Sequence, residues 1–510
     1  MGIELITKIK NKCTKEMKFA FLFTFIGGLL VHMYKFTNNL PNHDSLYNFY
    51  SDQNVIGSGR WFLSIACGFS SYYDLPWLNG LLSILFISLT AVVLIHILKI
   101  KNPIVIFISC GLLVTYPPVV ETLCFAFTAD GYMLAMLFSA LSVYFIIKIN
   151  NNFKSIAVGS ILLCLTCAIY QAYVSFAIVL FLCWFILSLF TQNNPVKNYL
   201  TPILRFAFSL LIGLSLFYTI WKLSLFVFQV PINDYQGINN MGLLGFNELF
   251  LSIKKVITAF ITIIFEKNIL KHGISLYGVF NIIFIFSAII ILIISIKKAK
   301  IHKNPSKLLS LIASLIFMPF SVCLWQFVSS EVVYSFRMMQ SVVLIFILFV
   351  VLCEQYIKNY FATIFAILNI LIIANLSVQA NVAYYYLNYE YENTYAEAVQ
   401  LEFELNKICA KYDNKYPIAI IGHRETEVAL DQTTEANGCF MYTSMIEKSL
   451  LLDSIHTENF LKNVLYFDKE FVNSKTAEKI QKTTEYSNMT PWFNGGNIEI
   501  IDNVITVKLG

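Results

Sequence analysis

Residues 78–98, LNGLLSILFISLTAVVLIHIL, decide the fold class, because this run contains no Asp, Glu, Lys or Arg. A helix needs roughly 20 mostly apolar residues to cross the hydrocarbon core of a bilayer, where backbone polar groups must be satisfied within the segment. Similar runs recur along the 510 residues, which are 57% hydrophobic and only 13% charged, with a mean hydropathy of +0.67. These values exclude an ordinary soluble enzyme and predict a polytopic membrane protein in a lipid bilayer.

Eleven membrane spans are predicted by length and hydropathy, at residues 18–36, 78–98, 103–117, 130–148, 155–171, 173–190, 204–229, 274–296, 308–328, 339–356 and 360–379. The third is short, and the fifth and sixth nearly fuse at Ile169–Gln171. Lysines cluster before the first span and at every second turn after it, including the run from Lys297 to Lys307. Because Lys and Arg in short loops favour the cytoplasm, the amino terminus is expected on the cytoplasmic side of the membrane and the carboxyl terminus on the outer side.

The composition becomes polar after about residue 380. The pattern predicts an amphipathic helix over 391–412, a strand over 417–422, helical segments within 443–465 and a hairpin-like pair over 497–508. Cys409 and Cys439 lie in this tail, where oxidation is chemically allowed, so a disulfide between them stays open. We therefore expect an all-α transmembrane bundle of about eleven helices over residues 1–380 and a small extracytoplasmic α/β domain over 381–510.

The first external loop carries the most informative polar residues, in the stretch NHDSLYNFYSDQNVIGSGRW at 42–61. Asp44 lies close to the membrane surface, where a partly desolvated carboxylate suits a general base or a ligand of a phosphate-bound metal. Asp52 is expected to be an ordinary solvent-exposed carboxylate. His43 neighbours Asp44, and Tyr47 and Trp61 could stack against sugar faces.

The other external loops add polar residues on the same predicted side. Arg60 and Arg337 could hold a lipid-linked phosphate, since the guanidinium fork suits that group, or contact lipid headgroups. Lys222 could neutralise the same phosphate or extend outward from the seventh span. Further candidates for sugar or acceptor contacts follow in chain order: Glu121, Asp130, Tyr170, Gln171 and Glu331. The apolar stretch 256–265 is too short to cross and is expected to be re-entrant or interfacial.

These motifs, in their order, resemble the Gtr-type glucosyltransferases that modify bacterial O-antigen and related polysaccharides. They are HDSLYN at 43–48, GRW at 59–61, TADGYMLAML at 128–137, YQ at 170–171 and the late Arg337, and the resemblance covers roughly residues 18–380. It implies a GT-C-like helical bundle, a polyprenyl-phosphate sugar donor and a catalytic carboxylate at Asp44. Relatives often carry paired acids where His43 precedes Asp44 here, which leaves open a divalent metal and assistance from Asp52 or Asp130.

The resulting functional hypothesis is transfer of a sugar, with glucose favoured, from a polyprenyl-phosphate donor to a cell-surface polysaccharide acceptor. Asp44 would be the base on the outer face. A flippase or transporter of lipid-linked sugars is the alternative, but it predicts polar residues at mid-membrane and repeated, broken spans. A polysaccharide polymerase would also use external arginines and stays open. The soluble part carries no basic, aromatic-interleaved patch, so no nucleic-acid partner is expected.

Overall fold

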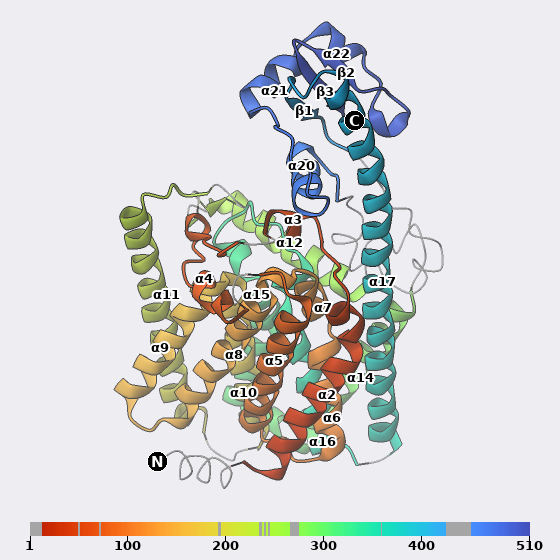
Figure 1. The fold of residues 1–510 in the computed structure, drawn as a ribbon. Helices are drawn as coiled ribbons and strands as arrows, with labels where there is room; N and C mark the ends of the chain where they lie inside the picture. Colours follow the sequence, from red (N-terminus) through yellow and green to blue (C-terminus); the bar gives the residue numbers. More distant parts are fainter. Residues whose placement is uncertain are drawn as a thin grey trace, which may run out of the picture.

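The computed structural model describes residues 13–48, 51–70, 73–191, 195–233, 237–238, 241–242, 245–265, 275–358, 360–424 and 450–510. Most of these residues form a helical bundle, and a small module with a three-stranded sheet stands above one end of it (Figure 1). We call this the module-facing end. The opposite end holds the beginning of helix α2 at Lys15.

Nine helices in the described part of the chain are long and apolar enough to cross a membrane, in agreement with a membrane protein. They are α2 (Lys15–Thr37), α5 (Pro76–Leu98), α8 (Ala126–Lys148), α9 (Asn152–Ile169), α10 (Val174–Thr191), α11 (Leu200–Phe228), α14 (Leu276–Lys298), α15 (Pro305–Val322) and α17 (Tyr360–Lys411). Two of them, α5 and α15, start at a proline, whose fixed φ and missing N–H suit the first turn of a helix.

Two of the eleven predicted spans differ from a single long helix. The third is α6 (Pro103–Thr115) followed by α7 (Pro117–Cys124), with a 41° bend between them; counted as one span, this pair raises the number to ten. Pro117 removes a backbone donor at the junction, which accounts for the bend. The tenth is a 17-residue apolar helix, Gln340–Tyr356, that includes α16 (Val343–Tyr356) and falls short of a full span. The count of eleven therefore remains a prediction.

The bundle is held together by apolar packing of α5 against α2 and α8, and of α9 against α8 and α11. One polar link crosses it near the module-facing end. The buried ring of His32 on α2 lies 2.8 Å from the Tyr384 hydroxyl of α17 and 3.0 Å from the Val114 carbonyl oxygen of α6. Both ring nitrogens are thus satisfied inside the protein, which is the condition for burying a polar group at low cost.

Helix α17 is one continuous helix of 52 residues. The prediction of a span at 360–379 and a separate helix at 391–412 is wrong in this respect, because the helix runs through residue 380 without a break. Its first part packs on α6 and α14, and its last part belongs to the module. At 1.5 Å per residue its length is about 78 Å, well beyond the roughly 30 Å hydrocarbon thickness.

We call the last turns of α17, from Tyr391, together with residues 412–424 and 450–510, the C-terminal module. Strand β1 (Ile418–Ile421) pairs in parallel with β3 (Val504–Lys508), which pairs antiparallel with β2 (Glu499–Ile501). The predicted strand and hairpin are confirmed. Helices α20 (Ser454–Asn463), α21 (Ser474–Gln481) and α22 (Thr484–Asn488) complete the module. Cys409 is buried in its core, and Cys439 lies outside the described residues.

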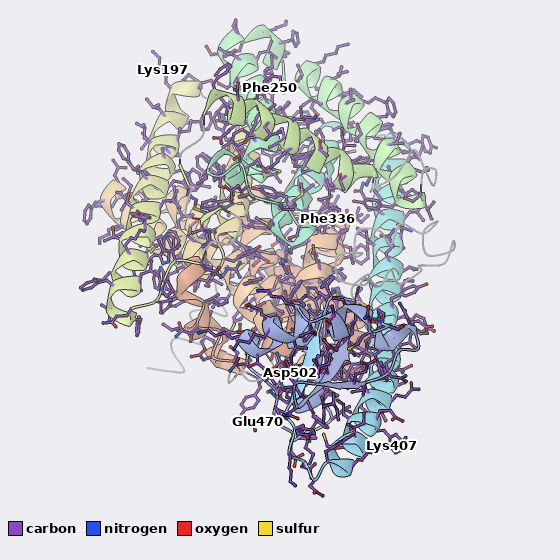
Figure 2. All side chains as sticks on the ribbon, turned by 90° about the horizontal axis from the view of Figure 1, so that it is seen from above. Lys197, Phe250, Phe336, Lys407, Glu470 and Asp502 are labelled. Carbon is purple, nitrogen blue, oxygen red and sulfur yellow. The ribbon has the colours of Figure 1, made fainter. Side chains whose placement is uncertain are left out.

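Helix α12 (Phe246–Phe265) contains the predicted non-crossing stretch. Its residues Phe246, Phe250, Ile257 and Ile261 are exposed, whereas Ser252 and Val256 are buried against the bundle. Figure 2 shows this helix, marked by Phe250, side-on from above, so it lies across the module-facing end. An exposed apolar face on a helix in this orientation is typical of an interfacial helix.

Candidate active site

A cavity of 480 Å³ opens at the module-facing end of the bundle. It gathers two arginines, two carboxylates and a histidine from segments far apart in the sequence. Its lining comprises His43, Asp44, Gln53, Val55, Ser58, Arg60, Leu63, Glu121, Phe125, Phe127, Thr128, Tyr132, Asn233, Ser335 and Arg337. The sequence predicted five of these as site residues, namely His43, Asp44, Arg60, Glu121 and Arg337, and the fold brings all five to one cavity.

Asp44 stands on a short, tightly hydrogen-bonded turn. The Asn42 side-chain oxygen accepts the Ser45 N–H at 2.9 Å, and the Asn42 amide donates to the Cys124 carbonyl oxygen at 3.1 Å. These bonds start helix α3 (Ser45–Asn48) and tie the turn to the end of α7. Asp44 keeps 42% of its side chain exposed, and its Oδ1 lies 3.5 Å from Nε2 of the largely buried His43. The turn thus presents a solvent-reachable carboxylate at a fixed place.

Arg60 is positioned by the tight turn that precedes it. Gly59 adopts φ +82°, and a Cβ there would lie 2.7 Å from Nε2 of Gln171, so both the backbone angle and the close approach favour glycine. The Arg60 guanidinium donates to the Tyr132 hydroxyl at 3.2 Å and lies 4.8 Å from the centre of the Tyr170 ring. The two tyrosine rings stack 4.5 Å apart. This aromatic support orients a cation toward the cavity.

Arg337 supplies the second cation, from the short 3-10 helix Phe336–Met338 that packs on α7. Its guanidinium carbon lies 4.0 Å from the centre of the Phe125 ring. Its backbone N–H donates to Oε2 of Glu121, a buried residue that also lines the cavity. Glu121 therefore fixes the backbone of Arg337 at the cavity, which the Arg337 side chain helps to line.

This arrangement suits a substrate that carries both hydroxyl groups and a phosphate. Two guanidinium groups can hold a phosphate through paired, charge-assisted hydrogen bonds. An exposed carboxylate can accept a proton from a hydroxyl group. Within the described ranges no group of three His, Cys, Asp or Glu side chains is placed to hold a metal ion.

Other predicted site residues lie around the cavity without lining it. Tyr170 and Gln171 border a smaller space of 50 Å³ that shares Ser58 and Arg60 with the main cavity. The side-chain amide of Gln171 donates to the Ser58 carbonyl oxygen at 2.9 Å and so braces the Gly59 turn. The backbone carbonyl oxygen of Gln171 accepts from the Trp325 indole N–H at 2.9 Å. Trp61 is half-buried and packs edge-on against Phe62.

The remaining predicted residues are placed elsewhere. Asp130 is fully buried beside Cys67 and Ser70. Lys222 is exposed on α11, over the rings of Tyr218 and Trp221. Glu331 is exposed next to the Gly237 turn. Tyr47 lies in α3, and the position of its side chain falls outside the described part of the structure.

Sequence reasoning missed Tyr132 and Phe125, which support the two arginines. Tyr132 lies in the quoted TADGYMLAML motif, two residues after Asp130. Residues two apart on a helix do not share a face, so choosing the acid directed attention to the wrong side of α8. The aromatic residue within the same motif was the available signal.

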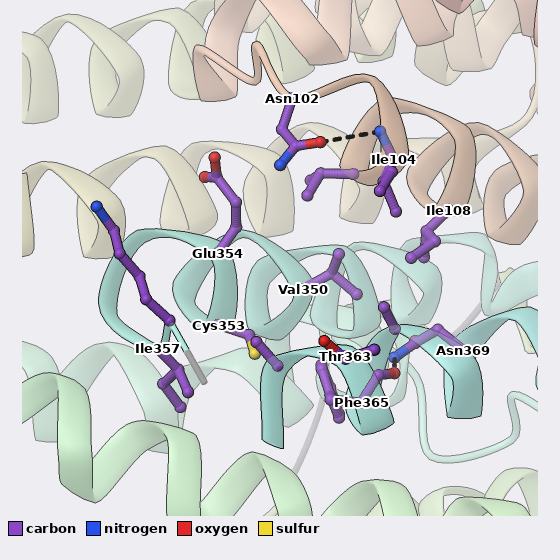
Figure 3. A pocket seen from close by; sticks show the side chains of 14 residues that line it. Asn102, Ile104, Ile108, Val350, Cys353, Glu354, Ile357, Thr363, Phe365 and Asn369 are labelled. Carbon is purple, nitrogen blue, oxygen red and sulfur yellow. Dashed lines mark hydrogen bonds between the residues drawn. The ribbon is translucent and has the colours of Figure 1, made fainter. Parts of the chain in front are cut away.

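A second cavity, of 390 Å³, lies at the opposite end of the bundle between α6, α16 and α17 (Figure 3). It is lined mainly by apolar side chains such as Ile108, Val350 and Phe365. The amide groups of Asn102 and Asn369 bond to backbone, and Glu354 and Lys358 are its charged side chains. It lacks the paired arginines of the first cavity, which we therefore take as the candidate active site.

The fold and the cavity together define a class: a multi-helix membrane protein with a polar, two-arginine cavity at one end of its bundle. Residues 33–348, more than half of the chain, match the family model described as glucosyl transferase GtrII, and the chain belongs to this family of glucosyltransferases. The match covers every residue that lines the cavity. Comparison with curated proteins and with solved structures gave no match.

Proposed function

We propose that the protein transfers glucose from a polyprenyl-phosphate donor to a polysaccharide of the bacterial cell envelope. One observation carries this proposal: a single cavity holds the exposed carboxylate of Asp44 together with Arg60 and Arg337. Membership of the glucosyltransferase family supports the sugar, and the two arginines support a phosphate-linked donor. The apolar helices of the bundle support a donor whose lipid part resides in the bilayer.

The mechanism follows from the roles open to these side chains. An acceptor hydroxyl gives its proton to Asp44 while its oxygen attacks the anomeric carbon of the donor glucose. The bond from that carbon to the phosphate oxygen breaks, and its electron pair stays on the phosphate. Arg60 and Arg337 stabilise this phosphate anion, since fixed cations in a partly dry cavity act strongly on developing charge. A single displacement of this kind inverts the anomeric centre.

The reaction is proposed for the outer face of the bacterial cytoplasmic membrane. The lysine distribution supports a cytoplasmic amino terminus, and eleven crossings would put the carboxyl terminus outside. The cavity lies at the same end of the bundle as the C-terminal module. A lipid-linked donor then meets a surface polysaccharide without a nucleotide sugar crossing the membrane.

The test is transfer of radiolabelled glucose from a synthetic polyprenyl-phosphate donor to envelope polysaccharide by the purified protein. We expect Asp44→Asn to lower kcat by about 10²–10⁴-fold, because the amide keeps the size of the side chain but cannot take a proton. The matched control is Asp52→Asn, since Asp52 is exposed and its Oδ1 accepts the Asn54 N–H in a local turn.

Equal damage from both variants would count against Asp44 as the base. If the wild-type protein transfers no glucose but moves the labelled lipid between liposome leaflets, the flippase hypothesis replaces the glucosyltransferase hypothesis. Extension of the polysaccharide by whole repeat units would instead indicate the polymerase.

A further inference from the structure

The core of the C-terminal module contains one residue from the first loop of the bundle. Leu46, two positions after Asp44, is 1% exposed and belongs to the same apolar cluster as Leu401 and Leu405 of α17, Ile420 of β1 and Phe460 of α20. Burial of an apolar side chain away from water favours the contact between the loop and the module. The loop that carries the proposed base is thus anchored in the C-terminal module, whose core residues lie more than 350 positions further along the chain.

A second contact joins the two parts next to Asp44 itself. The rings of His43 and His456 lie with their centres 6.0 Å apart, and α3 packs against α20. His456 is held in turn by Asp453, whose Oδ1 lies 2.8 Å from its Nδ1 and also accepts its backbone N–H at 3.0 Å. Figure 1 shows α20 directly above α3, which agrees with these contacts.

The inner side of the same loop is fixed by the bundle. The buried Lys35 ammonium donates to the Leu40 carbonyl oxygen at 2.6 Å, and Asn42 bonds to the end of α7. The His43–Asp44 pair therefore lies between two supports. The bundle provides the support on one side, and Leu46 with His456 provides the support on the other.

We propose that the C-terminal module is a positioning element of the glucosyltransferase site, with Leu46 and His456 holding Asp44 in its working place. This inference rests on the proposed function, because it gives the module a role in the same reaction. The module lies outside the family match, which ends at residue 348. Loss of the contacts leaves Arg60 and Arg337 in place while the carboxylate gains freedom.

In Figure 2 the module, marked by Glu470 and Asp502, lies to one side of Phe336, the neighbour of Arg337. The contacts of the module described above, through Leu46 and His456, reach the loop that carries Asp44. We expect its loss to affect the proton-accepting step more than donor binding.

The experiment compares five variants of the full-length protein in lipid nanodiscs: two test variants, a control for each, and one rescue variant. Leu46→Ala removes the anchor, and its control Ile480→Ala removes a buried aliphatic side chain from the other apolar cluster of the module, which does not contain Leu46. His456→Ala removes the ring contact, and its control is His423→Ala, an exposed histidine of the same module. Each is measured by amide hydrogen exchange and by glucose transfer.

We expect amides of residues 42–48 to exchange at least about tenfold faster in Leu46→Ala and His456→Ala, while amides of 454–463 keep their protection. The kcat for glucose transfer should fall at least about tenfold, while the KM for the donor should stay within about twofold of the wild-type value. A displacement of a catalytic group by about 1 Å can lower the rate 10²-fold. His456→Phe should recover part of the loss by restoring a ring at that place.

Unchanged exchange of residues 42–48 in both variants would overturn the inference, as would equal effects of His456→Ala and His423→Ala. The exchange measurement needs no catalysis. If the wild-type protein transfers no glucose, the proposed function fails, and faster exchange of residues 42–48 would still show that the module holds the loop.

Discussion

At the scale of single residues, the candidate site depends on two guanidinium groups seated on aromatic rings. Arg60 lies over Tyr170 and Arg337 over Phe125, so each cation is oriented before a substrate arrives. A lysine keeps the charge but loses the planar fork and the ring stacking. The geometry, and not the charge alone, should therefore determine the rate.

Replacement of either arginine by lysine tests this point. We expect Arg60→Lys and Arg337→Lys each to lower kcat for glucose transfer by about 10²–10³-fold, the cost of losing one well-placed stabilising group. Arg205→Lys is the control, because Arg205 bonds to Asn152 and to backbone carbonyls at the far end of the bundle. Full activity in both site variants would show that only charge matters.

The residues of the site could largely be predicted from the sequence, and the omissions have a physical reason. Asp44, Arg60 and Arg337 combine reactive side chains with positions near span ends, which a sequence displays directly. Lys222 shares these properties, but the side of α11 on which it lies depends on packing. Gln171 is predicted to contact a sugar, and the hydrogen bond of its side-chain amide to the Gly59 turn depends on a contact that only the folded chain reveals.

At the scale of elements, the start of α20 links charge to the placement of the first loop. Asp453 caps this helix. Burial favours a higher pKa for Asp453, but the hydrogen bonds from the backbone and ring of His456 outweigh burial and lower the pKa below its usual value. A carboxyl group whose pKa is lower in the folded than in the unfolded state stabilises the fold. This stabilisation is complete above the unfolded pKa, near 3.9, and is lost as the pH falls through the lower pKa of the folded state.

We therefore expect Asp453→Ala to weaken α20 by about 1 kcal/mol at pH 7, the usual effect of losing such a cap. The difference from wild type should shrink at pH values below about 4. Amide exchange within 454–463, corrected for the intrinsic rate at each pH, measures it. Asp468→Ala serves as control, since 84% of the Asp468 side chain is exposed. A difference that stays constant with pH would contradict the assignment to the charged form.

Helix α17 shows where element boundaries escaped sequence analysis. The composition changes near residue 380, and the pattern was divided there into a span and a separate helix. Residues 380–390, ANVAYYYLNYE, contain no Gly or Pro to end a helix. A change of surroundings from lipid to water alters which side chains are favoured but does not interrupt backbone hydrogen bonds.

At the scale of the whole molecule, the cavity and the module share one end of the bundle, and the lysine pattern predicts which side that is. Lys415 in the module and Lys303 in the turn between α14 and α15 are exposed and mark the two ends. We expect a cysteine at position 415 to react with a membrane-impermeant maleimide in intact cells. A cysteine at position 303 should react only after permeabilisation.

The background for this labelling carries Cys13→Ser and Cys439→Ser. Among the described cysteines Cys13 is exposed and the others are buried, and Cys439 lies outside the described residues. Labelling of position 303 in intact cells, with protection of position 415, would invert the predicted topology and move the reaction to the cytoplasmic face.

The unbroken course of α17 has a consequence for how such chains can diverge. Each residue inserted into a helix turns everything beyond it by about 100° and advances it by about 1.5 Å. One extra residue between the bundle and the module would swing α20 away from the first loop, whereas seven would return it to nearly the same bearing, about 10 Å higher. Because that rise would also lift α20 off the first loop, relatives that keep a docked module should have the same number of residues in this segment, a constancy that an alignment of their lengths would reveal.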